Sequence, residues 1–406
     1  MLDESLLDAP EALTRADTDD LLRGAAEAGA RVRAGARAAA EAGLTALRPE
    51  GRPRAVLLAG PGAATVCAAE LLGALGNGNA PVTALRPTGA RATADALRWS
   101  LPGWVGPLDL LLVHGPEGTE PGLTALVEQA YRRGCTVLAL TPERSPLADA
   151  VGETRGMTLP LPTRPRATGT PPAGAGEFGG SPARGAAAPP ETYPGVPDHR
   201  TPPGALWDLL TPLLVLLDRL GLLHAPGPAV EALADRLDET ARNCGPARPT
   251  YGNPAKTLAT ELADTFPLLW SEGRAADAVA RAWAGQVAAR LGRPALAAPL
   301  PEAIAAHGPL LAGAFAPAAD LDDFFRDRVD EPEPTRARVV LLRDTTADGE
   351  SATGTARDLA LAHHTPISEL DPTEGGGALE AAAELFATLE FATVYLTLAS
   401  DASAGP

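Results

Sequence analysis

The sequence predicts an α/β fold with two similar units, each a mainly parallel sheet flanked by helices in three layers, with a disordered Pro/Gly-rich insertion between them. In both halves, short strands that are apolar on both faces alternate with helices, which is typical of a parallel sheet covered on both sides. Hydrophobic residues make up 45% of the chain and aromatic residues only 4%, as expected for Ala, Leu and Val cores. At 406 residues the chain is long enough for two domains.

The first half opens with two expected helices within residues 3–47. The run Arg54–Ala59 then predicts a buried strand, closed by Gly60-Pro61-Gly62 and followed by a helix over residues 63–75. Further strands are expected at residues 82–85, 108–113 and 135–140, with a helix over 123–132. We therefore predict N-terminal helices at 1–49 that pack on the first domain, which spans 50–162.

The insertion predicts a linker, because 18 of the 41 residues from Arg164 to Gly204 are Pro or Gly. Such a segment buries too little apolar surface to offset its ordering entropy. We assign the linker to residues 163–204, and interdomain helices with the second domain to 205–406. Strands are expected there at 266–270, 295–297 and 338–342, and helices at 206–223, 228–242, 275–290, from 301, at 353–362 and as a pair within 378–399.

Charge and cysteine usage exclude several classes of function. The net charge of −17 and pI near 4.8 argue against a nucleic-acid partner, which needs a basic face. No run reaches the roughly 18 apolar residues of a membrane span, and the acidic N-terminus is unlike a secretory signal, so we expect a cytoplasmic protein with no membrane partner. The three cysteines are isolated, which predicts neither disulfides nor a metal site.

The stretch from Tyr251 to Gly273 combines a helix and a strand in 23 residues. Asn253 is a predicted N-cap, with Pro254 in the first helical turn, and Phe266–Trp270 is a predicted strand. Lys256 is the only lysine in the chain. It is either a functional residue or a solvated residue of a first helical turn.

Several motifs occur together in the second half: Asn253-Pro254-Ala255-Lys256, Pro267–Trp270, Trp283 with Gln286, Leu300-Pro301-Glu302 and Val340–Asp344. Their order and spacing resemble the bifunctional phosphoglucose/phosphomannose isomerases, which are built from two sugar isomerase (SIS) domains. The resemblance implies a double SIS fold and a hexose 6-phosphate as ligand. It also implies isomerisation of glucose or mannose 6-phosphate to fructose 6-phosphate without metal or cofactor, and usually a homodimer with sites at interfaces.

The family holds the phosphate in loops after its first and third strands, rich in Gly and Ser. In the first loop here Gly60 and Gly62 remain, and Thr65 lies one step from the expected serine. In the second loop only Thr119 matches, and Glu117 would place a negative charge beside a dianion. With Lys256 these are the candidate substrate-binding residues. Plain strand-to-helix turns explain the glycines about as well.

The candidate catalytic residues are Glu302 and His307. Glu302 matches the glutamate of the family's Leu-Pro-Glu motif, and His307 falls in the following run, where the resemblance places the family's base. Proline occupies the base position, at Pro309, and the family's ring-opening histidine and near-terminal lysine have no counterpart. Glu302 is equally a helix-start residue and His307 a structural histidine. Three hypotheses stay open: a divergent isomerase, a catalytically lapsed regulatory protein that binds sugar phosphate, and a scaffold without a ligand.

Overall fold

The computed structural model describes residues 2–49, 51–91, 93, 95–161, 201–313, 315, 335–344, 351–373 and 375–403. Nearly all of the predicted disordered insertion at 163–204 lies outside these residues. The described part contains two parallel sheets flanked by helices, so the predicted α/β fold class is confirmed.

The first sheet is parallel throughout, in the order β2-β1-β3-β4-β5. Its strands are β1 (Val56–Ala59), β2 (Val82–Leu85), β3 (Leu110–His114), β4 (Thr136–Thr141) and β5 (Met157–Pro160). β3 begins two residues later than predicted because Asp109 is held in a turn by Arg54, at 2.7 and 3.0 Å, and by the Gly106 N–H. The edge strand β5 was not predicted, since its half-buried residues form no continuous apolar run.

The second sheet is also parallel, in the order β7-β6-β8-β9. Its strands are β6 (Thr265–Glu272), β7 (Leu296–Pro299), β8 (Arg336–Arg343) and β9 (Ile367–Leu370). The central pair, β6 and β8, is buried along most of its length, as the apolar sequence predicted. β9 was missed because it is a short edge strand with alternating exposure.

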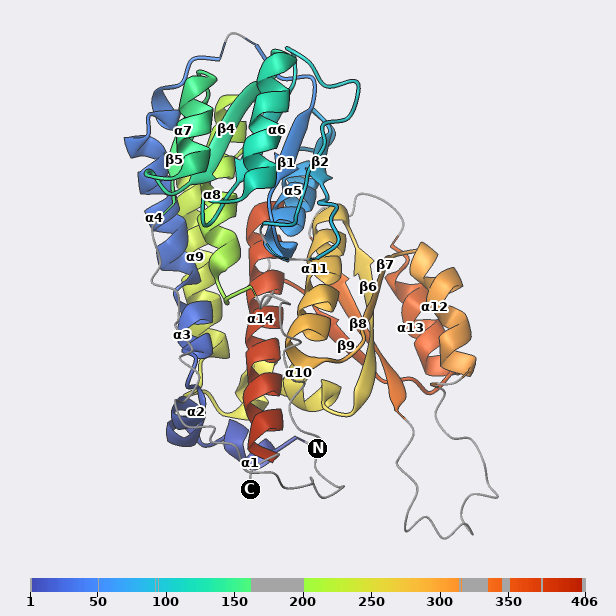
Figure 1. Cartoon of the computed structure of the whole chain (residues 1–406). Coiled ribbons are helices and arrows are strands. Elements are labelled where there is room, and N and C mark those ends of the chain that lie inside the picture. The colour runs from blue at the N-terminus through green and yellow to red at the C-terminus, as the bar shows by residue number, and fades with distance from the viewer. Residues whose placement is uncertain are drawn as a thin grey trace, which may run out of the picture.

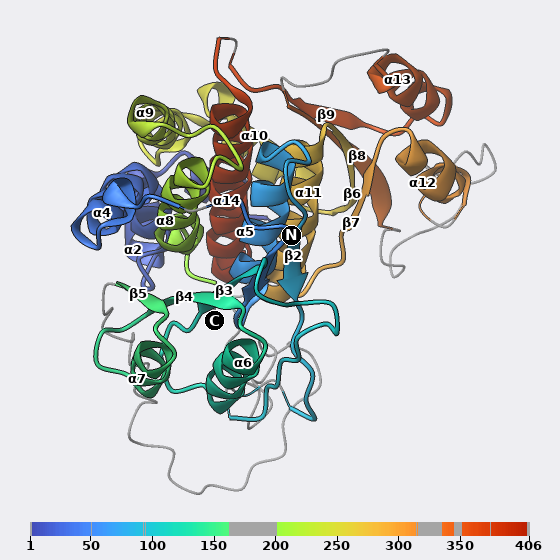
Figure 2. The same ribbon diagram turned by 90° about the horizontal axis from the view of Figure 1, so that it is seen from above.

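Helices cover both faces of each sheet (Figures 1 and 2). α5 (Ala63–Leu75) and α8 (Ala205–Arg219) pack on the inner face of the first sheet, and α6 (Pro121–Arg132) and α7 (Pro146–Glu153) on its outer face. α10 (Pro254–Leu262) and α11 (Arg274–Leu291) lie on the inner side of the second sheet, with α12 (Glu302–Ala312) and α13 (Thr353–Ala362) outside.

The N-terminal region forms more pieces than the two predicted helices: α1 (Glu4–Leu7), α2 (Pro10–Ala16), α3 (Leu21–Ala26), α4 (Ala28–Glu41) and a short 3-10 turn at Leu44–Ala46. Asp17 accepts the N–H groups of Leu21 and Leu22, which satisfies free donors at the start of α3. α4 packs mainly against α8 and α9 (Gly227–Cys244), where Arg33 pairs with three carboxylates of α9.

Helix α14 (Ala378–Ser403) runs through the middle of the molecule as one continuous helix rather than the predicted pair (Figure 1). Within the described residues it alone is long and apolar enough to cross a membrane, but 89% of its most apolar window is buried inside the protein. α14 packs against α9, α10 and α11. It belongs to a single hydrophobic cluster that includes the inner faces of both sheets, which is the place of a core helix.

Candidate functional site

The carboxyl edge of the first sheet has the topology of a ligand site. β2 and β3 lie on opposite sides of β1, so the strand order reverses between β1 and β3. Ligands of open parallel α/β sheets bind at such a switch point, beyond the carboxyl ends of the strands. The predicted loops 60–65 and 114–119 follow these two strands directly.

Thr65 ties the two loops together. Its hydroxyl donates to the Pro61 carbonyl at 3.1 Å and lies 3.1 Å from Nδ1 of His114. Gly60 makes the close approach possible, because a Cβ there would lie 2.5 Å from the His114 carbonyl oxygen. Burial lowers the pKa of His114 to about 4, so its imidazole is neutral at pH 7. Of the predicted substrate-binding residues, Gly60 and Thr65 are thus brought together, although the Thr65 side chain is turned inward and buried.

Helix α5 begins in the open at Gly62. Gly62 is exposed, has φ = +82°, and no side chain in the described part of the chain caps the helix start. The first N–H groups of a helix have no partner within the helix, and the helix dipole favours an anion beside them. α5 has 13 residues, so its aligned peptide dipoles place a positive partial charge at this start. Since Ala63 is also exposed, the start of α5 can accept a phosphate from solvent.

The loop after β3 is shaped by Glu120 instead. Glu120 is buried at the start of α6, and its Oε1 accepts the Glu117 N–H at 3.3 Å. Its Oε2 has no hydrogen-bond partner among the described residues, and burial raises the pKa of this carboxyl. Thr119 and Glu117 are both exposed. The loop therefore presents Thr119 to solvent next to acidic groups that disfavour an anion.

The second sheet has the equivalent switch point between β6 and β8, but a carboxylate already occupies the helix start there. Asp344, directly after β8, is buried and accepts the N–H groups of Ala275 and Ala276 at 3.0 and 3.2 Å. Both N–H groups belong to the first turn of α11, which begins at Arg274. Gly273 (φ = +106°) lies so close that a Cβ there would overlap the carboxylate. An external anion would have to displace Asp344.

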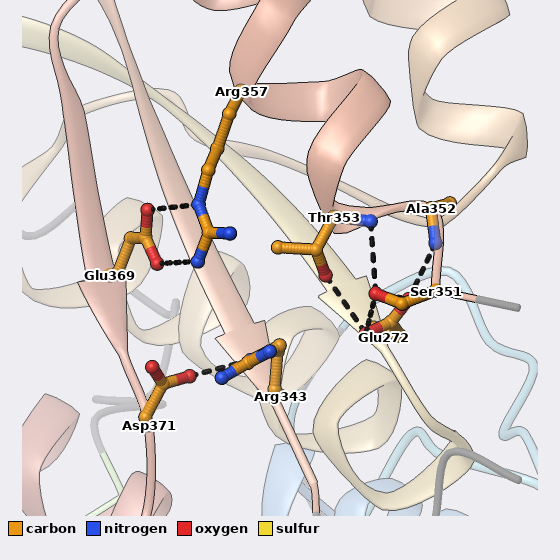
Figure 3. A network of polar contacts seen from close by, with 8 residues as sticks. All are labelled: Glu272, Arg343, Ser351, Ala352, Thr353, Arg357, Glu369 and Asp371. Carbon is orange, nitrogen blue, oxygen red and sulfur yellow. Dashed lines mark hydrogen bonds and ion pairs between the residues drawn. The ribbon is translucent and has the colours of Figure 1, made fainter.

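Glu272 caps the start of the neighbouring helix α13 in the same way (Figure 3). Its carboxylate accepts hydrogen bonds from the Ser351 hydroxyl at 2.9 Å, the Ala352 N–H at 2.8 Å and the Thr353 hydroxyl at 2.8 Å. Burial acts to raise the pKa of Glu272, but these hydrogen bonds outweigh it and the pKa is lowered. The start of α13 therefore carries an internal anion.

The arginines at this edge are paired as well. Arg343 donates to Asp371 at 2.7 Å, and Arg357 forms a bidentate salt bridge with Glu369, with donor–acceptor distances of 2.6 and 2.5 Å (Figure 3). The charges of Arg343 and Arg357 are thus neutralised by two carboxylates in and directly after β9. Neither Glu272 nor Asp344 was predicted as a site residue. The signal that could have found them is their position at the carboxyl ends of two adjacent central strands, Glu272 as the last residue of β6 and Asp344 directly after β8.

Lys256 is buried rather than solvated, so the solvated alternative is wrong. Its Nζ donates to the carbonyl oxygens of Leu7, Pro246 and Arg248 at 2.6, 2.8 and 2.7 Å, and it lies 5.5 Å from the ring centroid of Tyr395. An ammonium group has three N–H donors, and all three are used. Burial lowers the pKa of Lys256, with Asp8 acting against it. In this conformation Lys256 joins the N-terminal helices to α10.

His307 and Glu302 lie on α12, on the outer side of the second sheet (Figure 1). His307 is buried, and its Nδ1 accepts the indole N–H of Trp270 at 3.1 Å. Burial lowers the pKa of His307, which keeps the imidazole neutral. Glu302 is exposed in the first turn of α12.

Within the described residues, no group of three or more His, Cys, Asp or Glu side chains could hold a metal ion.

Known proteins are similar to this chain in sequence over its second half and in fold over most of its length. The family of bacterial phospho-glucose isomerase C-terminal SIS domains matches residues 252–405. No curated protein matches the chain by sequence. A protein from Silicibacter pomeroyi assigned as a phosphosugar isomerase has a TM-score of 0.54 at 17% identity, over 94% of this chain and 98% of its own.

Two further solved structures are similar over most of their length. A protein from Salmonella typhimurium assigned as a sugar binding protein has a TM-score of 0.52 at 14% identity, over 92% of this chain and 99% of its own. Glucosamine-6-phosphate deaminase from Thermotoga maritima has a TM-score of 0.53 at 12% identity, over 86% of each chain. At such identities the likeness shows the fold alone. Residues 252–405 thus match the SIS-domain family of the bacterial phospho-glucose isomerases, and the likeness to solved structures shows that the fold extends over most of the chain.

Proposed function

We propose that this protein binds a sugar phosphate at the start of α5 in the first domain, and that it isomerises hexose 6-phosphates slowly or not at all. One observation carries the proposal: α5 begins without a side-chain cap among the described residues, whereas α11 and α13 in the second domain begin on Asp344 and Glu272. A phosphate can bind the first helix start without displacing any group of the protein.

The residues available for chemistry support binding over turnover. An aldose–ketose isomerisation needs a base that reaches C1 and C2 of the sugar. His307 is buried and already accepts the Trp270 N–H, and Glu302 lies on the same outer helix. Pro309 stands inside α12 where the resemblance places the base. A regulatory or sensing role, in which the bound sugar phosphate shifts a conformational equilibrium, needs none of these groups.

The ligand class follows from the family. The chain resembles the phosphoglucose/phosphomannose isomerases, and its second half matches the phospho-glucose isomerase SIS domain, so a hexose 6-phosphate is the first candidate ligand. The similar Thermotoga maritima protein is, by name, a glucosamine-6-phosphate deaminase. Homodimeric assembly and a cytoplasmic location remain predictions from the resemblance and the sequence.

The proposal is tested by thermal unfolding with glucose 6-phosphate and, as a control, glucose. A ligand that binds only the native state raises Tm, so we expect a shift at millimolar sugar phosphate and none with glucose. Ala63→Glu places a carboxylate at the exposed helix start, and Ala63→Gln is its neutral match. We expect Ala63→Glu to weaken binding about tenfold or more through charge repulsion and Ala63→Gln to leave it nearly unchanged. No shift in the wild type, or equal effects of the two variants, would overturn the proposal.

A further inference from the structure

The imidazole of His114 lies beside the start of α5, at the switch point of the first sheet. His114 is the last residue of β3, and its Nδ1 is 3.1 Å from the hydroxyl of Thr65, the third residue of α5. Gly60 leaves room for the imidazole, because a Cβ at Gly60 would lie 2.9 Å from the Cβ of His114. The same Thr65 hydroxyl contacts the Pro61 carbonyl, so the ring stands next to the loop that leads into the helix.

The contacts of Thr65 decide which ring nitrogen of His114 carries the proton. A hydroxyl group has a single proton to donate, and that of Thr65 goes to the Pro61 carbonyl at 3.1 Å. The hydroxyl oxygen therefore accepts the Nδ1–H of His114. In a neutral imidazole the other nitrogen, Nε2, is then an acceptor without a proton. At pH 8 an imidazole is neutral even at the ordinary pKa of 6.5, and burial lowers the pKa of His114 further.

The Nε2 atom of His114 is open to solvent. His114 is partly exposed, and its Nε2 makes no hydrogen bond to any residue that the structure describes. Nor does Nε2 belong to the buried polar atoms of these residues that lack a partner. An accessible nitrogen without a proton can accept a hydrogen bond from a bound molecule, but it offers no proton to a phosphate oxygen.

We propose that His114 determines the specificity of the site at α5: its Nε2 accepts a hydrogen bond from a hydroxyl group of the bound molecule. The site then prefers a phosphate ester that carries hydroxyl groups, as a sugar phosphate does, to a phosphate ester without them. This inference rests on the proposed phosphate site at the start of α5.

The two loops at the switch point have different parts in this arrangement. The helix start after β1 offers N–H groups to the phosphate, and the end of β3 offers an acceptor to the sugar. The exposed Glu117 in the loop after β3 agrees with this division, because its carboxylate disfavours an anion and can tolerate a hydroxyl donor.

Calorimetric titration of the full chain at pH 8 tests the role of His114. The ligands are glucose 6-phosphate and ethyl phosphate, which has no hydroxyl group on its carbon chain. In His114→Leu, which removes the acceptor, we expect the preference for glucose 6-phosphate, measured as the ratio of the two Kd values, to fall about two- to tenfold. The Kd for ethyl phosphate should stay nearly unchanged. His114→Gln keeps an acceptor oxygen and should retain part of the preference.

The outcomes separate this inference from the proposed function. If the wild type binds neither ligand, the phosphate site is wrong and the role of His114 is refuted with it. If the wild type binds both ligands and His114→Leu weakens both equally, or changes neither Kd, the phosphate site stands and the role of His114 is refuted. A purely structural role predicts the equal weakening, because a disturbed loop affects both ligands.

If His114→Leu does not fold, ¹⁵N NMR of the wild-type imidazole decides. We expect the Nε2 of His114 to carry no proton at pH 8, and its resonance to shift more with glucose 6-phosphate than with ethyl phosphate. A protonated Nε2 in the free protein, or equal shifts with the two ligands, would overturn the proposal.

Discussion

The carboxylate of Asp344 accepts the N–H of Ala275 at 3.0 Å, so the residue directly after one central strand caps the helix that follows the neighbouring strand. The two residues are 69 positions apart in the sequence. This contact places an internal anion at the second domain's switch point. Under the proposed function, this contact is the reason that a phosphate would bind at the first switch point and not at the second.

Replacing Asp344 tests this cap. Asp344→Ala removes the acceptor of two buried N–H groups, and we expect the free energy of unfolding to fall by about 1–2 kcal/mol. Asp344→Asn keeps an acceptor oxygen and should lose less. Urea unfolding of both variants measures the difference. Equal losses would mean that the hydrogen bonds to α11 are not what Asp344 contributes.

Lys256→Met should be among the most damaging single changes. It leaves the carbonyl oxygens of Leu7, Pro246 and Arg248 without their donor in a buried site, and we expect a loss of about 3 kcal/mol or more. Tyr251→Ala, at a side chain that is 92% exposed, is the control and should change stability by less than about 0.5 kcal/mol. Urea unfolding gives both values.

The burial of Lys256 can also be measured chemically. An amine-reactive reagent should not label Lys256 in the native protein and should label it once the protein is unfolded. Rapid labelling of Lys256 in the native state would contradict the buried position and would restore it as a candidate ligand-binding group.

Substitutions at His307 distinguish a structural role of this side chain from a catalytic one. His307→Leu leaves the Trp270 indole N–H buried without its acceptor, and we expect a loss of about 1–3 kcal/mol. His307→Asn places an amide oxygen near the position of Nδ1 and should lose less. If His307→Asn instead kept full stability and abolished a measurable isomerase activity, the catalytic hypothesis for His307 would be supported.

His114 makes stability depend on pH. Burial holds its folded-state pKa near 4, below the ordinary value of 6.5. Between pH 4 and 6.5 the unfolded chain therefore binds the extra proton, so stability from this group is present above pH 6.5 and is lost as the pH falls toward 4. Because the side chain is only partly buried, we expect about 1–2 kcal/mol. The difference between wild type and His114→Asn, followed by urea unfolding across this range, isolates the effect.

Local signals predicted much of the fold. The central strands β1, β3, β4, β6 and β8 are buried on both faces and read as apolar runs, and Asn253 caps α10 as its position before Pro254 predicts. The edge strands β5 and β9 were missed because each has only one fully buried residue and forms no continuous apolar run. The sequence of α14 contains no Pro or Gly that would end a helix, and the structure has one continuous helix where a pair was expected.

The site was harder to predict because its decisive contacts are distant in sequence. Gly60, Gly62 and Thr65 stand where the loop pattern placed them. In contrast, Lys256 reaches Leu7 across 249 residues, and Glu272 reaches Ala352 across 80. Residue type alone predicts a polar side chain at these positions, and only the folded chain shows which partner each one has.

The protein as proposed here binds a sugar phosphate and has little or no isomerase turnover. The most direct measurement is a coupled assay that follows fructose 6-phosphate formed from glucose 6-phosphate and from mannose 6-phosphate at saturating substrate. We expect turnover far below about 1 per second, outside the range of ordinary enzymes. Turnover of about 1 per second or faster with either sugar would contradict the account.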